Sequence, residues 1–429
     1  MAQSLSRRAE ETLSTEMFLS PYFSLVRNNR FHPTHNRKGI VDLGLAENKL
    51  CARELEKKLS SIAREPEDQS LQFYDKSTGN TELKKSVKKF LETRFHAREE
   101  LSLENLFITN GVTVILEALS FALAEPEDYI MVPSPYYYRI NSDLFDRPRV
   151  HVLEVKLPYT PTKGSGCTYE HDVRAFEDAL IKAKIEGKKI RALLLVNPHN
   201  PTGDVVTRQQ LLDILDFAQR NDLHIIANEI YGLSVYEPDV EFTSILSLEH
   251  PDPDKVHFTW GFSKDFGLSG YRCAVLYTRH QLLCKYVSLT AIYFRANGLI
   301  QLRLKSMIED EEWLDKTFFP TMKQRMLERY HLYKETLEKL DVQVHPSKAT
   351  IFIWADFSKY LRKKSFDNEK KLFESFLKAG VFLLPGESCF SKDPGWFRIV
   401  AALDDEVNNE GLERLVQLLK SIKISDSLQ

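Results

Sequence analysis

Short runs of apolar and β-branched residues alternate with helical patterns along most of the chain. This alternation is typical of a mostly parallel, doubly wound α/β sheet, in which helices connect successive strands. Two of the runs, LLLV and HIIA, are almost continuously apolar, as expected of strands that are buried on both faces. The strands predicted for this sheet are Leu106–Thr109, Tyr129–Val132, Arg191–Val196, His224–Ala227, Val256–Trp260 and Cys273–Tyr277.

The pattern changes in the last third of the chain, where a long charged helical stretch covers Trp313–Leu340. Three apolar runs then predict the strands of a smaller α+β domain: Ile351–Phe357, Val381–Leu384 and Phe397–Ala401. A chain of 429 residues is long enough for one large and one smaller domain. We expect an N-terminal arm with part of the smaller domain at 1–50, a large domain at 51–305 and the C-terminal smaller domain at 306–429, with a hinge in Asn297–Glu309.

Composition and charge argue against several classes of protein. The chain has 43% hydrophobic and 28% charged residues and a net charge of −3, so we expect neither a nucleic-acid partner nor an anionic membrane surface. No apolar run approaches the roughly 20 residues of a membrane-spanning helix, and the N-terminus lacks the apolar core of a secretory signal. Five cysteines without CxxC spacing indicate reduced thiols and no bound metal: Cys51, Cys167, Cys273, Cys284 and Cys389. These features predict a cytoplasmic protein.

The segment Gly261–Arg272 holds the most informative chemistry. It places Lys264 in a turn rich in serine and glycine, eight positions before Arg272. A lysine amine becomes a useful nucleophile where its site lowers its pKa, and the planar guanidinium of an arginine suits a phosphate. One group for an aldehyde and one for a phosphate describe a site for pyridoxal 5′-phosphate (PLP). A surface turn with an unrelated lysine and arginine is the alternative.

This segment resembles the cofactor-lysine segment of fold-type I PLP enzymes, the aspartate aminotransferase superfamily. The resemblance implies PLP as the cofactor, a Schiff base on Lys264, and a homodimer, because this superfamily builds each site from two chains. It implies a large domain with a doubly wound sheet beside a smaller α+β domain. The superfamily usually has a serine three positions before the lysine, where this chain has Gly261, so one hydroxyl contact to the phosphate is lost. Ser263 is aimed differently but is kept among the cofactor-binding candidates.

A glycine-containing turn follows the first predicted strand, at the carboxyl end where doubly wound sheets bind ligands. It consists of Gly111, Val112 and Thr113 and opens a helix, whose free N–H groups suit a phosphate. The resemblance implies that this turn cradles the PLP phosphate. An ordinary helix cap is the alternative.

Two further turns carry candidates for the PLP ring. Tyr137, within Tyr136–Tyr138, matches an aromatic residue that stacks on the ring, although adjacent tyrosines suit a protein interface equally well. Asn200 lies in Asn197–Gly203, which resembles the NPxNPTG turn of the superfamily, and the resemblance implies that it contacts the phenolic oxygen. Two Asn-Pro steps indicate rigid turn geometry with a cis bond.

The predicted strand His224–Ala227 is followed by Asn228-Glu229-Ile230-Tyr231, where the superfamily has Asp-Glu-x-Tyr. Tyr231 keeps the tyrosine that bonds the phenolic oxygen. Asn228 replaces the aspartate that pairs with the protonated ring nitrogen. An amide is neutral and offers its N–H groups to an unprotonated nitrogen, so the ring becomes a weaker electron sink. With Lys264, these two residues are the catalytic candidates.

One arginine in the predicted smaller domain matches the substrate-carboxylate arginine of the superfamily. Arg398 lies in Gly395-Trp396-Phe397-Arg398, on a predicted strand. A guanidinium fork binds a carboxylate with two parallel hydrogen bonds. A solvated surface charge is the alternative, although the flanking tryptophan and phenylalanine argue against it.

Several stretches resemble 1-aminocyclopropane-1-carboxylate (ACC) synthase, and within that branch the animal ACC synthase-like proteins. They are Ser20–Phe23, Gly44–Cys51, Pro133–Tyr137, Ser263–Arg272 and Pro394–Arg398, so the resemblance spans residues 20 to 423. It implies an amino-acid substrate such as S-adenosylmethionine or vinylglycine, proton removal from Cα by Lys264, and β/γ-elimination or ring closure. Glu47 and Tyr22 match substrate-binding positions, where the acidic Glu47 suits a sulfonium. Structural roles in the N-terminal arm are equally open for both.

The segment Tyr74–Gly79 departs from the plant enzymes. They place a tyrosine two residues before the glycine, where this chain has Ser77. Tyr74 lies five residues before the glycine, as in aminotransferases, and the resemblance implies that it reaches the PLP phosphate of the neighbouring subunit. Three functions therefore stay open: an ACC synthase-like lyase, an amino-acid aminotransferase, and a PLP-binding pseudoenzyme weakened by Asn228.

Overall fold

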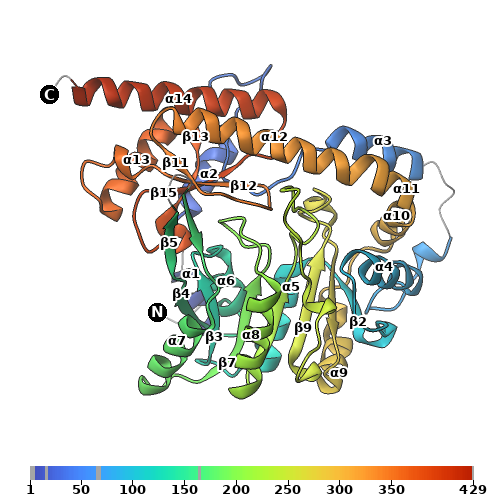
Figure 1. Cartoon of the computed structure of the whole chain (residues 1–429). Helices are drawn as coiled ribbons and strands as arrows, with labels where there is room; N and C mark the ends of the chain where they lie inside the picture. The colour runs from blue at the N-terminus through green and yellow to red at the C-terminus, as the bar shows by residue number, and fades with distance from the viewer. Residues whose placement is uncertain (1–4, 15–17, 64–68, 163–165, 428–429) are drawn as a thin grey trace.

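A seven-stranded sheet forms the centre of a computed structural model that describes residues 5–14, 18–63, 69–162 and 166–427 (Figure 1). The strand order is β2-β10-β9-β8-β7-β3-β4. Neighbours from β9 to β4 run parallel, whereas β10 is antiparallel to both β2 and β9. The strands are β2 (Leu106–Thr109), β3 (Tyr129–Ser134), β4 (His151–Lys156), β7 (Ile190–Val196), β8 (His224–Asn228), β9 (Val256–Gly261) and β10 (Ala274–Thr278). The predicted mostly parallel, doubly wound sheet is confirmed.

Each of the six predicted strands is present, with ends that differ by at most two residues. Strand β4 was not predicted. Its sequence, HVLEVK, interleaves charged residues with apolar ones, and most of its side chains are only half-buried because it is an edge strand. A search for buried apolar runs therefore passes over it.

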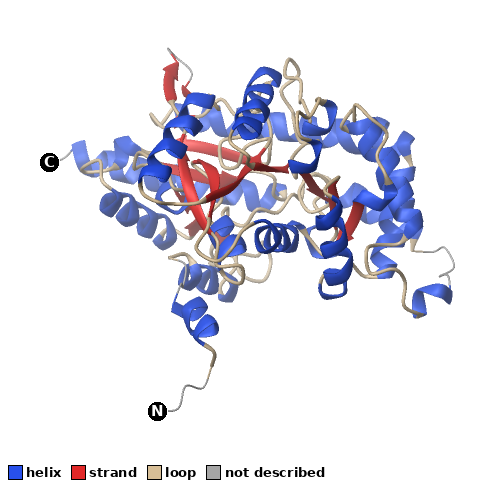
Figure 2. Ribbon diagram, turned by 90° about the horizontal axis from the view of Figure 1, so that it is seen from below, coloured by secondary structure: helices blue, strands red, loops and turns tan. Residues whose placement is uncertain are grey.

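Helices cover both faces of this sheet, as the view from below shows (Figure 2). Side-chain caps mark where several of them begin. Asn80 accepts hydrogen bonds from two N–H groups at the start of α4, and Thr207 forms a capping box with Gln210 at the start of α8. The helices up to residue 309 are α1 (Arg7–Ser14), α2 (Ser20–Asn28), α3 (Ala52–Ile62), α4 (Thr81–Arg94), α5 (Val112–Leu123), α6 (Arg139–Phe145), α7 (Val173–Ile185), α8 (Arg208–Arg220), α9 (Gln281–Thr290) and α10 (Gly298–Glu309).

A second sheet, of four antiparallel strands in the order β11-β12-β15-β14, lies below the C-terminal helices in Figure 1. Its strands are β11 (Gln343–Val344), β12 (Phe352–Asp356), β14 (Leu384–Pro385) and β15 (Trp396–Val400). The helices around it are α12 (Phe319–Glu338), α13 (Phe366–Lys378) and α14 (Asp405–Ser427). The short α11 (Glu311–Trp313) and a π-helical segment, η7 (Leu314–Phe318), precede α12, so the predicted helical stretch Trp313–Leu340 is present.

The predicted strand Val381–Leu384 is divided between two sheets, so its prediction as one strand was wrong. Its first half, β13 (Val381–Phe382), pairs in parallel with β1 (Val41–Asp42), and Leu384 begins β14. All four residues are buried, which is why a single apolar run gave no sign of the break. A separate hairpin joins β5 (Tyr159–Thr162) to β6 (Gly166–Tyr169). The segment proposed as a hinge is helix α10, capped by Asn297, and the domain boundaries remain predictions.

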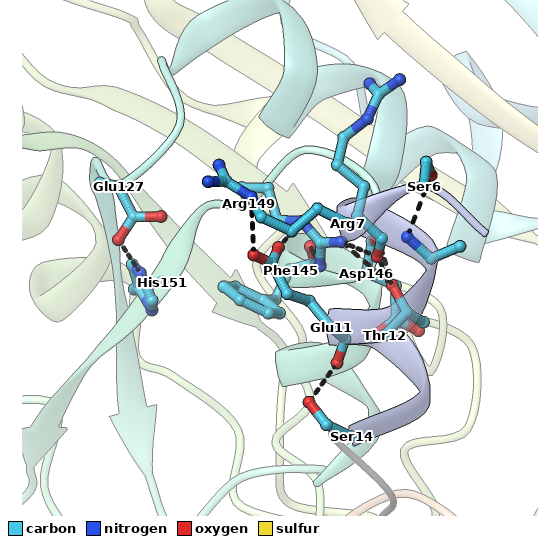
Figure 3. A network of polar contacts seen from close by, with 12 residues as sticks. Ser6, Arg7, Glu11, Thr12, Ser14, Glu127, Phe145, Asp146, Arg149 and His151 are labelled. Atoms are coloured by element: carbon cyan, nitrogen blue, oxygen red, sulfur yellow. Dashed lines mark hydrogen bonds and ion pairs between the residues drawn. The ribbon is translucent and has the colours of Figure 1, made fainter. Parts of the chain in front are cut away.

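The N-terminal helix α1 is attached beside strand β4 through one buried arginine (Figure 3). The guanidinium of Arg149 donates hydrogen bonds to the Arg8 carbonyl and, at 3.2 Å, to the Thr12 hydroxyl. It also lies 3.7 Å from the Glu11 carboxylate. Thr12 in turn donates to the Asp146 carbonyl at 3.1 Å. These contacts tie α1 to the end of α6, the helix that follows Tyr137.

No helix of the described residues is long and apolar enough to cross a bilayer. The side chains of Cys51, Cys273, Cys284 and Cys389 are buried and free, and the side chain of Cys167 lies outside the described part.

Candidate active site

A cavity of about 210 Å³ lies at the carboxyl ends of the parallel strands. The turns that follow β2, β3, β7, β8 and β9 all contribute to its lining, which is where an open α/β sheet binds ligands. The predicted site residues that line it are Val112, Thr113, Tyr137, Asn200, Asn228, Tyr231, Ser263, Lys264 and Arg272. Residues from five separate stretches of sequence are thus brought to one place.

Lys264 lies in the turn directly after β9, and its side chain is partly accessible from the cavity. Its amine donates a hydrogen bond to the Ala46 carbonyl at 2.5 Å. Burial removes water from the amine and so lowers the pKa of Lys264 from 10.5 to about 8. The charges of Arg398 and Arg272 also lower this pKa, while Glu47 opposes the shift. A lysine with such a pKa is partly neutral near physiological pH, and the neutral amine is the nucleophile and the base.

The phosphate candidates form one end of the cavity. Gly111 precedes α5 with a φ of 134° and no side-chain cap, so the first N–H groups of α5 are left for an anion. A Cβ atom on Gly111 would lie 2.3 Å from the Arg272 guanidinium, so only glycine allows this arginine to approach. Ser269 also lines this end. The side chains of Thr113 and Arg272 are exposed, so this end is open to solvent.

The candidates for the PLP ring are more deeply buried. Asn228 is 8% exposed, and its carboxamide oxygen accepts a hydrogen bond from the Ile230 N–H at 3.3 Å, so its amide hydrogens remain as donors toward the cavity. Tyr231 is 2% exposed, and burial raises the pKa of its phenol, which therefore stays protonated. The peptide bonds before Pro198 and Pro201 are both cis, as the turn sequence predicted.

Arg398 extends from β15 toward the same turn and is 1% exposed. Its guanidinium donates to the Asn200 carboxamide oxygen at 3.0 Å and to the Gly44 carbonyl at 2.8 Å, and it lies 4.3 Å from the centre of the Phe352 ring. Its Nε–H has no hydrogen-bond partner, and it forms no ion pair within the described residues. A buried guanidinium without a counter-ion is a favourable place for a carboxylate ligand.

Besides Gly111 and Arg398, which adjoin the cavity, three predicted residues lie outside its lining. Tyr22 is half-buried and packs edge-on against Phe373, with ring centres 4.8 Å apart. Glu47 lies 3.5 Å from Arg30, and it acts on the site only through its charge near Lys264. Tyr74 is 97% exposed.

Sequence reasoning missed three polar residues at the site, of which one is Ser269 at the phosphate end. Asp143 lines the cavity from α6, and burial raises its pKa to about 7, while Arg139 at 3.2 Å opposes the shift. The available signal was the spacing of Tyr137, Ile140 and Asp143, which lie three positions apart, because residues at that spacing share a helix face. Asn48 donates to the Lys264 carbonyl at 3.0 Å, a contact between residues more than two hundred positions apart that no local pattern predicts.

Residues 40–415 match the family model described as Aminotransferase class I and II. The chain belongs to the aminotransferase class I and II family. Its predicted similarity to ACC synthase-like proteins is confirmed. It is 32% identical to "1-aminocyclopropane-1-carboxylate synthase-like protein 1" of Takifugu rubripes, over 98% of this chain and 68% of that protein. It is also 32% identical to the human "Probable inactive 1-aminocyclopropane-1-carboxylate synthase-like protein 2", over 89% of this chain and 67% of that protein.

The fold is also that of solved aminotransferases. The aromatic aminotransferase from Pyrococcus horikoshii OT3 superimposes with a TM-score of 0.75 at 22% identity, over 90% of this chain and 97% of that chain. The predicted fold-type I architecture, a seven-stranded sheet with a smaller α/β part, is therefore confirmed. Members of the aminotransferase class I and II family typically use PLP, bind amino-acid substrates and form dimers.

Proposed function

We propose that this protein is a PLP-dependent enzyme that removes a proton from Cα of an α-amino acid. The observation that carries the proposal is a lysine in the cavity beside a buried arginine that bonds to Asn200 of the cavity lining and whose charge acts on that lysine. Lys264 has a lowered pKa, and Arg398 is a buried guanidinium with no carboxylate partner among the residues that the structure describes. An amine that is partly neutral and an arginine that lacks its anion together suit an α-amino acid beside a reactive aldehyde.

The lining of the cavity fits PLP. The uncapped start of α5, with Gly111 close to Arg272, suits the phosphate, and Thr113, Ser263 and Ser269 add hydroxyl groups. Tyr137 suits stacking on the ring, Asn200 and Tyr231 suit the phenolic oxygen, and Asn228 suits the ring nitrogen. When bound, PLP supplies an aldehyde and an electron-withdrawing ring that stabilises negative charge at Cα.

The remaining roles fall to residues of the chain. Arg398 holds the α-carboxylate, and the neutral amine of Lys264 takes the Cα proton. Tyr231 keeps its proton and donates a hydrogen bond. Asn228 donates through its amide hydrogens, because its oxygen is already bonded to Ile230. A neutral donor withdraws less charge than an aspartate pair, so Cα deprotonation is slower than in relatives with aspartate at this position.

We favour β/γ-elimination or ring closure as the step that follows, because relatives such as the protein of Takifugu rubripes are named ACC synthase-like proteins. Glu47 and Tyr22 remain proposed substrate residues, with the charge of Glu47 directed at a cationic side chain such as that of S-adenosylmethionine. Amino-group transfer is the second candidate and rests on the family match. A PLP-binding protein without turnover is the third. It is favoured by Asn228 and by the similarity to a relative named probable inactive.

We also propose a homodimer. Exposed apolar side chains lie on α9 and on η6 (Ala291–Tyr293), which directly follows it: Leu282, Leu289, Ile292 and Tyr293. Phe121 on α5 is exposed as well and stacks on Tyr286 of α9. Arg295 connects this face to Tyr74, since its guanidinium lies 5.8 Å from the Tyr74 ring. A second copy on this face would cover the apolar side chains and bring Tyr74 to the phosphate end of its partner's cavity.

Reductive trapping tests the proposed function. Borohydride is added to the PLP-loaded protein, and peptide mass spectrometry is expected to find the cofactor attached to Lys264. Absence of attachment at Lys264 would overturn the proposal. S-adenosylmethionine, vinylglycine and common amino acids are then screened for changes in cofactor absorbance. Ammonia and keto-acid release from vinylglycine supports the lyase, whereas amino-group exchange with an added α-keto acid supports the aminotransferase.

A further inference from the structure

A group of buried polar side chains joins the turn that carries Asn200 to the smaller sheet. The group consists of Thr202 and Asp204 on the turn side and His345 and Ser347 on the other side, and we call it the clasp. All four residues are less than 9% exposed. No group of three or more histidine, cysteine, aspartate or glutamate side chains in the described residues is arranged to hold a metal ion, so metal binding does not explain it.

The clasp makes both side-chain and backbone contacts. His345 Nε2 lies 2.9 Å from an oxygen of Asp204, and the Ser347 hydroxyl donates to the Thr202 carbonyl at 2.5 Å. The N–H groups of Lys348 and Ala349 both donate to the Gly203 carbonyl, at 3.0 and 3.1 Å. The turn is thus bonded along its length to the segment after β11.

Asp204 carries its charge inside the protein. Burial by itself would raise the pKa of its carboxyl group, but the charge and hydrogen bond of His345, together with a hydrogen bond from Thr202, hold the pKa below its ordinary value. Bonds to a buried charged group are stronger and more directional than bonds between neutral groups. The pair is therefore suited to fixing a geometry.

The clasp is connected to Arg398 through two backbone steps. The His345 N–H donates to the Trp354 carbonyl at 2.8 Å, and Trp354 is the cross-strand neighbour of Arg398 between β12 and β15. Arg398 itself returns to the turn by donating to Asn200. Two attachments consequently join the turn to the strand of Arg398, one direct and one through the clasp.

A bound substrate affects these two attachments differently. An α-carboxylate on Arg398 competes for the guanidinium hydrogens that now bond to Asn200 and Gly44. The bonds of the clasp involve neither the guanidinium nor Asn200. The clasp is thus the attachment that persists when the direct one is exchanged for substrate.

We propose that Asp204 and His345 are positioning residues that keep Arg398 in register with the Asn200 turn while substrate is bound. This inference rests on the proposed function in assigning Arg398 to the substrate carboxylate. Neither residue touches the reacting atoms. Their effect is on the spacing between the group that binds the carboxylate and the turn that faces the cofactor.

The test uses Asp204→Asn, His345→Asn and the double variant. The control is His257→Asn, since His257 is as buried as His345 and bonds to Thr278 at 2.8 Å, but it lies near the start of β9, at the end of the sheet opposite Lys264. Hydrogen exchange of the ligand-free protein is followed in residues 396–400 and, for reference, in 130–132 of β3, because β8 includes His224, which lies 3.0 Å from His257. The PLP-loaded protein is then titrated with L-alanine, which carries only the groups common to all α-amino acids, and the cofactor absorbance is recorded.

Each clasp variant is expected to exchange about ten-fold faster in residues 396–400 relative to 130–132, and to bind L-alanine about ten-fold more weakly, with PLP affinity changed less than about three-fold. The double variant is expected to match the single ones, because the two residues act as one pair. Unchanged exchange in 396–400, or an equal effect of His257→Asn, would overturn the inference. If the charge variants fail to fold, Ser347→Ala decides in the same way, with an expected effect of about three-fold. The exchange measurement involves no cofactor, so its outcome is separate from that of borohydride trapping on Lys264.

Discussion

The two ends of the candidate site differ in how far a single chain encloses them. At the inner end, Asn200, Tyr231 and Arg398 are at most 5% exposed, and Arg398 donates a hydrogen bond to Asn200. At the outer end, Thr113 and Arg272 are exposed, and Tyr74 is exposed almost completely. The inner end is assembled from segments of one chain, whereas the outer end faces the apolar side chains proposed as a dimer interface. The proposed binding of a substrate carboxylate and the proposed binding of a cofactor phosphate would therefore depend on different kinds of contact.

The largest expected effect comes from removing the reactive group that both ends surround. Lys264→Ala is expected to abolish borohydride trapping of PLP and any turnover, because no other lysine lines the cavity within the described residues. Peptide mass spectrometry measures the trapping. Attachment of PLP at another lysine with retained turnover would show that the site lies elsewhere.

Replacing one arginine at a time distinguishes the roles of the two ends. Arg398→Ala is expected to weaken binding of L-alanine to the PLP-loaded protein by about a hundred-fold, because a bidentate carboxylate partner is lost from a buried site. Arg272→Ala is the matched control and should instead weaken binding of PLP. Absorbance titrations measure both affinities. Loss of the same affinity in both variants would contradict the division into an inner and an outer end.

A charge introduced on the exposed apolar face tests whether that face binds a second copy of the chain. Ile292→Asp is expected to weaken the dimer at least about ten-fold, because it places a carboxylate in an apolar contact. Ile185→Asp is the control, since Ile185 is 82% exposed but belongs to α7. Analytical ultracentrifugation measures the association. A dimer that is unchanged by Ile292→Asp would place the interface on another face.

An aspartate in place of Asn228 tests whether this residue weakens the electron-withdrawing effect of the PLP ring. Asn228→Asp is expected to accelerate exchange of the Cα hydrogen of a bound amino acid in D₂O by about ten-fold, because a carboxylate stabilises a protonated ring nitrogen. NMR of the amino acid measures the exchange. Asn228→Leu, which removes the donor, should slow it. Equal rates in all three proteins would mean that the residue does not set the strength of the electron sink.

A further effect, confined to alkaline pH, is expected in the stability of the ligand-free protein. The pKa of Lys264 is lowered to about 8 in the folded state, so between pH 8 and its unfolded value of 10.5 the unfolded chain binds more protons. Stability contributed by this residue should therefore rise with pH across that window and be constant below it. Urea unfolding of Lys264→Met measures the difference, because the variant should lack this rise. A wild-type protein with the same pH profile as the variant would contradict the lowered pKa.

Much of the fold was accessible from sequence because its signals are local. Buried strands are continuous apolar runs, and the candidate residues follow those runs within a few positions, as Asn200 follows β7 and Lys264 follows β9. Prediction failed where the signal was weak or ambiguous. Strand β4 lies at the sheet edge, and the run at Val381 serves two different sheets. Asp143 was missed because the boundaries of a short helix had to be known before its spacing could be used.

The sequence by itself determined the family, the order of the strands along the chain and the turns that surround the cavity, since each of these is written in a few consecutive residues. Only the tertiary structure decided the lowered pKa of Lys264, the pairing of Arg398 with Asn200 and the clasp formed by Asp204 and His345. Those properties come from contacts between residues more than a hundred positions apart. Burial and charge act through space, so they become defined only when the chain has folded.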